Sequence, residues 1–303
     1  MGRLVLTLVV CGCSFDHGKS LDDAQLPDDD MMVIDTEIDG PATFGPWSPP
    51  MKFPELTDTG TVLDDPTLTD DLLEIYFDTD RLGDDDIFFA KRAKTTDPWG
   101  PPTLVANINT TSRESDPELS PDGLTLYFSS DRGGGMGGDD IYMTKRTSRT
   151  AAWMTETRVT SLNSAGSDDA PTMDGTKQRV VFFSTRTGGA GGGDLYEAKA
   201  NGATWTTPAR ITELNTASND YDPFLTSSGL GMFFDSDRTG GMGQQDLYET
   251  YRPSLTDPFV SPVLLTELNS SGRDMDPWLT TDLRTMVFAS DRSGEFEIYI
   301  TAR

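Results

Sequence analysis

Five copies of one pattern divide most of the chain at a fixed spacing. Each copy carries a proline that is followed fifteen residues later by an arginine. The prolines are Pro66, Pro117, Pro171, Pro223 and Pro277, and the arginines are Arg81, Arg132, Arg186, Arg238 and Arg292. Successive prolines are 51, 54, 52 and 54 residues apart, which suits a four-stranded blade with short loops. The chain is therefore expected to be a repeat protein, in which each unit packs on its neighbours.

The second copy shows how one unit is expected to fold. Its Pro-Asp-Gly run at 121–123 is a turn, because proline fixes φ and glycine accepts a positive φ. Aromatic and aliphatic residues then predict a strand over 124–130. A glycine loop at 133–138 leads to a third strand at 140–143, and the segment 156–162 is expected to be the fourth. One unit is thus an antiparallel sheet of four strands.

The two ends of the repeat predict a closed ring. A strand-like segment, 44–56, comes before the first copy, whereas the last copy ends after the strand at 297–301 without a fourth strand. An open array would leave two sheet edges unpaired, so the N-terminal strand is expected to complete the last blade. The predicted fold is all-β: a five-bladed β-propeller of four-stranded antiparallel blades, spanning residues 44–303.

An aromatic residue recurs before each repeat, eighteen or nineteen residues ahead of the proline. These residues are Trp47, Trp99, Trp153, Trp205 and Phe259. Because the position is the same in every copy, we expect packing between blades and not a platform for sugars.

The N-terminal residues carry two further expectations. Residues 1–13 contain one cation, a short apolar run and the sequence Val-Cys-Gly-Cys, which resembles a bacterial lipoprotein signal with Cys13 as the lipid anchor. Residues 14–43 hold nine acidic residues against one lysine, a composition typical of a disordered tether. The protein is therefore expected to be exported and lipid-anchored in the bacterial cell envelope, on the periplasmic or surface side of the outer membrane.

The repeat resembles a known family. The residues SPDGLTLYFSSDR and the later Asp-Ile-Tyr, found in full only in the second copy, are similar to the TolB-like, WD40-like propeller repeat. The resemblance implies a propeller, and the family includes periplasmic scaffolds and lipoproteins. TolB itself has six blades, whereas this chain has five copies, and a shared fold does not carry a function over.

Several chemistries are excluded by composition. Outside residues 1–43 there is no histidine and no cysteine, so a Ser-His-Asp, Cys-His or histidine-ligated metal site cannot be built there. Paired carboxylates remain, as glycosidases use them. Most acidic residues occupy equivalent repeat positions, which indicates a structural role. An Asp or Glu pair confined to one blade and buried in the central funnel would instead favour a glycosidase.

The acidic residues at the repeat markers are expected to form a network with the arginines. The start of strand one lies beside the end of strand two in an antiparallel pair, which brings each Asp-Pro aspartate near the Asp-Arg step. The network residues are Asp65, Asp80, Arg81, Asp116, Asp131, Arg132, Arg186, Asp222, Asp237, Arg238, Asp276, Asp291 and Arg292. The third copy has Ala170 and Thr185 in place of both aspartates. A repeated salt bridge is the preferred interpretation, and bound calcium is the alternative.

The strongest calcium candidate in the sequence is a run in the first copy. It comprises Asp78, Asp80, Asp84 and Asp86. Oxygen ligands of this kind suit Ca²⁺, although the spacing does not match an EF-hand loop.

The glycine loops are the expected partner surface. They are followed by a strand and not by a helix, so a nucleotide site is not expected. The net charge is −26, of which −19 falls on residues 44–303, and this excludes nucleic acid. Loops on a rigid scaffold are where binding usually resides. The expected contact residues are Gly134, Met136, Gly138, Gly189, Gly192, Gly241 and Met242.

These observations favour a non-catalytic function. We expect a monomeric envelope lipoprotein, not an enzyme, whose propeller is a scaffold or binding module for an envelope protein or glycan. Two alternatives stay open: a carboxylate-based glycoside hydrolase of the five-bladed type, and a calcium-stabilised structural surface protein.

Overall fold

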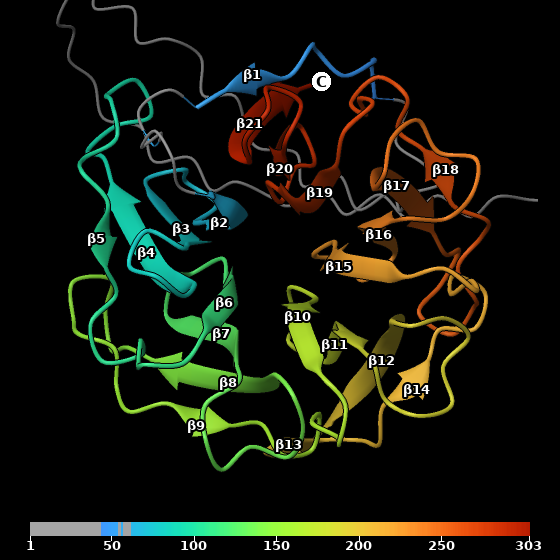
Figure 1. Cartoon of the computed structure of the whole chain (residues 1–303), viewed down its shortest axis with the longest axis horizontal. Coiled ribbons are helices and arrows are strands. Elements are labelled where there is room, and N and C mark those ends of the chain that lie inside the picture. Colours follow the sequence, from blue (N-terminus) through green and yellow to red (C-terminus); the bar gives the residue numbers. More distant parts are fainter. Residues whose placement is uncertain (1–43, 54–55, 57–61) are drawn as a thin grey trace, which may run out of the picture. The chain divides into compact units, whose positions relative to one another are not determined.

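The described residues between 44 and 303 form a five-bladed β-propeller. The computed structural model describes residues 44–53, 56 and 62–303; Cys13, the expected signal and the expected tether lie outside the described residues. The five blades surround a central axis, and the innermost strand of each blade faces it (Figure 1). No helical segment within the described ranges has the length and apolar character needed to cross a membrane.

Each blade is an antiparallel sheet whose first three strands follow one another outward from the axis. The outermost strand pairs with the third, and in blade 3 two short outer strands both pair with it. Blade 1 contains β2 (Asp64–Leu68), β3 (Glu74–Thr79), β4 (Asp86–Lys91) and β5 (Thr103–Leu104). Blade 2 contains β6 (Glu114–Leu119), β7 (Thr125–Ser130), β8 (Asp140–Lys145) and β9 (Thr157–Arg158). Blade 3 contains β10 (Asp168–Met173), β11 (Arg179–Ser184), β12 (Asp194–Asn201), β13 (Thr204–Trp205) and β14 (Ala209–Arg210).

The last two blades follow the same plan. Blade 4 contains β15 (Asp220–Leu225), β16 (Gly231–Ser236), β17 (Asp246–Tyr251) and β18 (Val263–Leu264). Blade 5 contains β19 (Asp274–Leu279), β20 (Thr285–Ser290), β21 (Glu297–Ala302) and, as its outermost strand, β1 (Met51–Lys52). The predicted fold class is confirmed, and the outermost strands are shorter than expected, with two residues in each.

The expected ring closure is present. We call the contact between β1 and β21 the seam; there the two strands pair antiparallel, with Met51 opposite Ile300. Backbone bonds extend the pairing beyond β1, from Ser48 N to Ala302 O at 2.8 Å and from Phe53 N to Ile298 O at 3.0 Å. The Arg303 guanidinium also stacks on the Trp47 ring, 4.2 Å from its centroid. The N-terminal segment therefore completes the last blade.

The hydrophobic core is divided into five clusters, each lying between two neighbouring blades. The cluster between blades 1 and 2, for example, joins Tyr76 and Ile87 of blade 1 to Leu126 and Phe128 of blade 2. Trp153 belongs to the same cluster and meets Tyr76 edge-on, with ring centroids 6.1 Å apart. The expectation that the recurring aromatics pack between blades is met there. Each blade depends on its neighbours for burial of its apolar surface.

A second arginine, at the end of the third strand, organises the recurring aromatics. Arg146 stacks on Trp153 at 4.5 Å and donates from Nε to the Gly123 carbonyl at 2.6 Å. The equivalent stacked pairs are Arg92 with Trp99, Arg252 with Phe259 and Arg303 with Trp47. Blade 3 has Ala200 at this place; its strand continues instead into a hairpin that ends in the half-buried Trp205.

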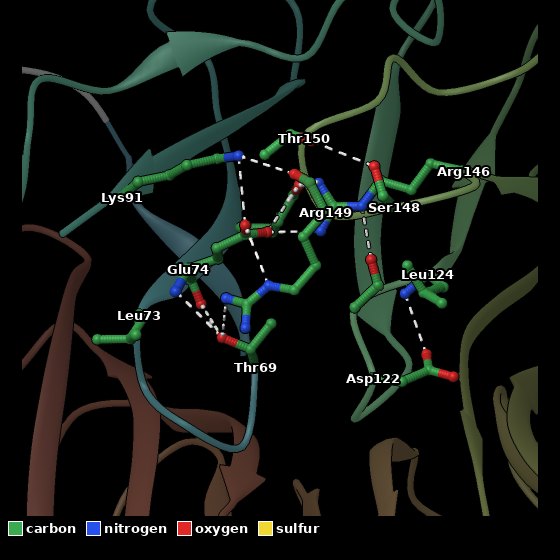
Figure 2. Close-up of polar contacts among 12 residues, drawn as sticks. Thr69, Leu73, Glu74, Lys91, Asp122, Leu124, Arg146, Ser148, Arg149 and Thr150 are labelled. Atoms are coloured by element: carbon green, nitrogen blue, oxygen red, sulfur yellow. Dashed lines mark hydrogen bonds and ion pairs between the residues drawn. The ribbon is translucent and has the colours of Figure 1, made fainter. Parts of the chain in front are cut away.

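Buried ion pairs reinforce the joint between blades 1 and 2. Glu74, only 4% exposed, receives Arg146 Nη2 at 2.6 Å, Lys91 Nζ at 3.2 Å and Arg149 Nε at 3.3 Å (Figure 2). Both arginines come from blade 2, whereas Glu74 and Lys91 belong to blade 1. Removing one partner of such a buried pair leaves an uncompensated charge, so the cluster ties these two blades firmly.

Substitution of Trp47 tests the seam. Trp47→Ala removes a ring that is 7% exposed, together with its stacking on Arg303, and should lower the free energy of unfolding by about 3–5 kcal/mol. Met51→Ala is the control, because Met51 lies in the same segment but is 67% exposed. Denaturant unfolding measures both variants, and equal stability of the two would contradict closure through Trp47.

Candidate functional site

The Asp-Pro steps converge on the propeller axis. We call the five residues before these prolines the Asp-Pro ring: Asp65, Asp116, Ala170, Asp222 and Asp276. Each has a positive φ, between 35° and 55°, and each sits where the pairing of the first two strands shifts by a β-bulge. Proline is tolerated at a bulge because its missing N–H leaves no ladder bond unmade. The ring lines a cavity of about 50 Å³.

A second set of carboxylates differs from blade to blade. These carboxylates lie at the start of the first strand or of the third strand of their blades. Both positions are at the end of the axis that carries the glycine loops. We call Asp64, Asp85, Asp139 and Asp169 the mouth carboxylates; all four are half-buried. At the position of Asp64 and Asp169 the other blades have Ser115, Tyr221 and Met275, and at that of Asp85 and Asp139 they have Gly193, Gln245 and Phe296.

Arg113 is a cation at this mouth. Its Nε atom lies 3.0 Å from Asp85 Oδ2, and its Nη1 atom lies 3.5 Å from Asp139 Oδ2. The charges of Asp116, Asp139, Asp78 and Asp85 raise the pKa of Arg113 against the opposing effect of burial. Asp139 keeps one oxygen, Oδ1, buried without a hydrogen-bond partner among the described residues.

Burial raises the pKa values of these carboxyl groups, and different neighbours oppose the rise. Burial raises the pKa of Asp64 to about 7, and contact with Asp78 opposes the rise. Burial also raises the pKa of Asp139, and the charge of Arg113 opposes the rise. The Asp64–Asp78 pair exists in blade 1 alone; the two residues lie opposite each other in the pairing of β2 with β3. It is therefore the type of blade-specific acidic pair that favours a glycosidase.

Burial and mutual repulsion act on the carboxylates deeper in the axis. Burial raises the pKa of Asp222 to about 6, aided by the charge of Asp116 and opposed by contacts with Asp276 and Asp235. Burial, followed by the charges of neighbouring aspartates, raises the pKa of Asp65 and Asp276 well above the usual range. The axis therefore holds more carboxyl groups than it can keep charged without a counterion.

Glu118 is a further residue confined to one blade. It follows Pro117, where the other blades have threonine, phenylalanine or tryptophan. It accepts hydrogen bonds from Thr67 Oγ1 at 3.2 Å and from Thr172 Oγ1 at 3.3 Å, one from each flanking blade. Burial raises its pKa to about 8, so the side chain is protonated at neutral pH. Glu118 lines the Asp-Pro cavity and a second cavity of about 40 Å³ beyond it.

The structure divides the expected aspartate–arginine network into two parts. Arg132 pairs with Glu114 at 3.0 Å and donates to the Ile108 carbonyl at 2.7 Å, whereas Asp116 lines the axial cavity. The acids equivalent to Glu114 are Asp168 with Arg186, Asp220 with Arg238 and Asp274 with Arg292. In blade 1 the equivalent residue is Leu63, and Arg81 stacks on Phe88 at 4.7 Å.

The aspartate before each arginine has a local role. Asp131 Oδ1 accepts the Arg113 backbone N–H at 3.0 Å, which fixes the loop that enters strand one. The equivalent acceptors are Asp80 for Val62, Asp237 for Asn219 and Asp291 for Arg273, and in blade 3 Thr185 Oγ1 replaces the carboxylate. These residues therefore shape the loops and do not reach the Asp-Pro ring through any described bond.

The calcium candidate from the sequence is not assembled as a group. Asp78 is buried beside Asp64 and Asp65, whereas Asp80 caps the backbone at Val62 and Asp84 is exposed. Asp86 is buried at the start of β4. Of the four, only Asp78 belongs to a cluster of potential metal ligands in the described chain.

The glycine loops pack against the next blade. A Cβ on Gly137 would overlap the Gly166 carbonyl, and one on Gly138 would overlap Ser167 Oγ. The acid that begins strand three caps each loop, as Asp140 Oδ2 does by accepting the Met136 N–H at 2.6 Å. Gly192 likewise approaches Asn219 of the next blade, whereas Gly189 and Gly241 lie against the capping acids Asp194 and Asp246. Gly134 has a positive φ of 90°. Met136 and Met242 are exposed, and these residues remain predictions as a contact surface.

A larger groove lies off the axis. It has a volume of about 380 Å³ and lies between the outer parts of blades 3 and 4, where Lys199, Arg210, Glu213 and Phe259 line it. It contains none of the axial carboxylates, so it is not the acidic site described above.

Comparisons with known proteins identify the fold. No family model matches the chain. No curated protein sequence matches it either. Among solved structures, a TolB of Agrobacterium tumefaciens matches with 16% identity and a TM-score of 0.47, over 80% of this chain and 76% of that one.

Two glycoside hydrolases match with higher TM-scores. The α-L-arabinofuranosidase of Podospora anserina, solved with cellotriose, has 12% identity and a TM-score of 0.56 over 85% of this chain and 96% of its own. The endo-arabinase of Bacteroides thetaiotaomicron has 15% identity and a TM-score of 0.55, over 80% and 94%. At such identities these likenesses show the shared propeller fold alone.

The matches nevertheless correct one expectation. The expected non-catalytic scaffold is contradicted, because several solved propellers that match this chain over nearly their whole length are glycoside hydrolases. The expectation that the protein is not an enzyme is contradicted for the same reason. The alternative that the sequence left open, a carboxylate-based hydrolase, accords better with this finding and with the blade-specific acids.

The pH dependence of stability tests the placement of Glu118. Its carboxyl group stays protonated in the folded protein up to about pH 8, whereas the ordinary pKa is 4.5. The folded state thus binds the proton more tightly, so this group's contribution to stability falls from about pH 4.5 to about pH 8 and then levels off. Glu118→Gln should remove that part of the slope and raise the melting temperature above pH 8.

Glu295→Gln is the matched control for this experiment, because Glu295 is exposed. Melting curves between pH 5 and pH 9, in chelator, give the difference between each variant and the wild type. A Glu118→Gln variant whose stability runs parallel to the wild type across that range would contradict the buried, protonated state.

Proposed function

We propose that the protein is a carboxylate-dependent glycoside hydrolase that acts at the mouth of the axial funnel. The observation that carries the proposal is a group of acids, present at these positions in only two of the five blades, gathered around Arg113. Burial raises the pKa of Asp64 to about 7, so this group carries a proton close to neutral pH, whereas Asp139 pairs with Arg113, whose charge favours the ionised form. Two carboxyl groups held in opposite protonation states are what acid–base cleavage of a glycosidic bond requires.

Asp64 and Asp139 have different roles in the proposed reaction. The Asp64 carboxyl group is the general acid, which donates its proton to the leaving-group oxygen; Asp78 is its buried partner. Asp139 is the general base, which removes a proton from the attacking water. Arg113 pairs with Asp139 at 3.5 Å and favours the ionised form of its carboxyl group.

The size of the axial cavities places the glycan outside them. Volumes of about 50 Å³ and 40 Å³ hold an ion or a few waters but not a sugar ring. The sugar therefore binds above the Asp-Pro ring, between the glycine loops, where the mouth carboxylates are half-buried. The matched hydrolases act on arabinose-containing substrates, and this is the class that we propose to test first.

Glycan hydrolysis by the purified protein is the direct test. Release of reducing sugar from arabinan and from a panel of aryl glycosides should be detectable with the wild type. Asp64→Asn and Asp139→Asn should each lower kcat by about 10²–10⁴-fold, the usual contribution of one acid or base. Asp84→Asn, an exposed aspartate of the same blade, should retain full activity. Absence of release from every glycan, or an equal loss in Asp84→Asn, would refute the proposal.

The location of the protein is a separate proposal. Export and lipidation at Cys13 would place the hydrolase in the cell envelope as a monomer beside glycans. Membrane fractionation should find the wild type with the envelope and the Cys13→Ala variant released from it. Recovery of the wild type in the cytoplasmic fraction would exclude this location while leaving the catalytic proposal intact.

A further inference from the structure

Three aspartates of the Asp-Pro ring meet closely on the axis. Ligand oxygens of Asp65, Asp222 and Asp276 all lie within 4.8 Å of one another. Asp65 belongs to blade 1, Asp222 to blade 4 and Asp276 to blade 5, so three consecutive blades of the closed ring contribute one carboxylate each. Like charges at this distance repel strongly in a buried setting, which requires either protons or a cation between them.

One oxygen of these three carboxylates lacks a hydrogen-bond partner among the described residues. Asp276 is 6% exposed, and its Oδ1 atom has no hydrogen-bond donor in the described chain. Its Oδ2 atom accepts a long bond of 3.3 Å from the Asp65 backbone N–H. A buried carboxylate oxygen without a donor is costly, and such a group calls for a ligand that supplies positive charge.

We propose that a calcium ion binds between Asp65, Asp222 and Asp276 on the propeller axis. Ca²⁺ binds oxygens at 2.3–2.6 Å, so two oxygens on one ion lie at most about 5 Å apart. The 4.8 Å limit observed for the three aspartates fits that span. The adjoining cavity of about 50 Å³ has room for the ion and one or two waters, which would complete its coordination.

The chemistry of the surrounding residues selects this kind of ion. Residues 44–303 contain no histidine or cysteine, so the ligands are hard oxygens, which Zn²⁺ and Cu²⁺ do not prefer. Arg113 is a neighbouring cation, but its guanidinium is paired with Asp85 and Asp139 at the mouth. Ala170 stands at the ring position in blade 3 and leaves a gap, where water can serve as a ligand.

This ion would lie below the mouth carboxylates, and its binding does not rest on the proposed hydrolase. It would neutralise the Asp-Pro ring and so favour the packing of blades 4, 5 and 1 around the axis. It would also shift the protonation of Asp65, Asp222 and Asp276 toward the charged form, because a bound cation competes with protons.

Calcium binding to the purified full chain tests the proposal, with catalysis left out of the readout. Isothermal titration of chelator-treated wild type with Ca²⁺ should show a binding site whose affinity falls at least tenfold in Asp276→Asn. Asp84→Asn is the control: it removes an exposed carboxylate and should bind Ca²⁺ as the wild type does. Melting curves should show that Ca²⁺ raises the melting temperature of the wild type but hardly that of Asp276→Asn.

The same melting curves show that the variant folds. Without Ca²⁺, Asp276→Asn should melt at or above the wild-type temperature, because it removes one of three mutually repelling charges. Asp222→Asn serves as a second variant with the same expectations. A wild type that neither binds Ca²⁺ nor gains stability from it would overturn the proposal. Equal Ca²⁺ affinity in the wild type, Asp276→Asn and Asp222→Asn would also overturn it, because the ion would then bind elsewhere.

Discussion

The repulsion between carboxylates on the axis is the constraint on which the rest of the structure depends. Four of the five ring positions are aspartate, and further acids lie directly above them. Such a cluster would separate if its supports could move. The five inter-blade clusters and the buried ion pairs at Glu74 prevent that, since no blade can shift outward without exposing apolar surface on both sides. The packing thus holds the acids closer together than their electrostatic repulsion favours.

Repeated and unrepeated residues have different tasks in this ring. The repeated ones build it. In blades 2 to 5 the arginine at the end of strand two pairs with an acid such as Glu114. An Asn fixes the third strand, as Asn163 does by bonding both backbone groups of Ile141. Positions that differ between blades face the axis, as Glu118 and the Asp64–Asp78 pair do. The asymmetry needed for acid–base chemistry therefore comes from a few departures inside an otherwise regular frame.

The sequence was sufficient for the frame because spacing alone fixes it. The register from Pro66 to Pro277, the turns and the orphan strands at each end predicted the five blades and the seam. The site was harder to predict, because it depends on the β-bulge at each Asp-Pro step. That bulge turns Asp116 to the axis and leaves Glu114 to meet Arg132. The run from Asp78 to Asp86 was a poor guide for a related reason: neighbours in sequence alternate their faces in a strand and diverge in a loop. Departures from the repeat, such as Glu118 in place of threonine, were the signal that could have revealed the site.

The seam has a consequence for how the molecule is made. β1 is synthesised first, yet its only pairing partner is β21, nearly 250 residues later, at the register of Met51 with Ile300. During synthesis the growing ring therefore presents an unpaired edge at each end, and loop closure over so long a span is slow. Successive blades can pack on one another in order, but the acids on the axis are brought fully together only when the ring closes. The close contact between the axial carboxylates, which is the most repulsive contact of the fold, therefore forms last.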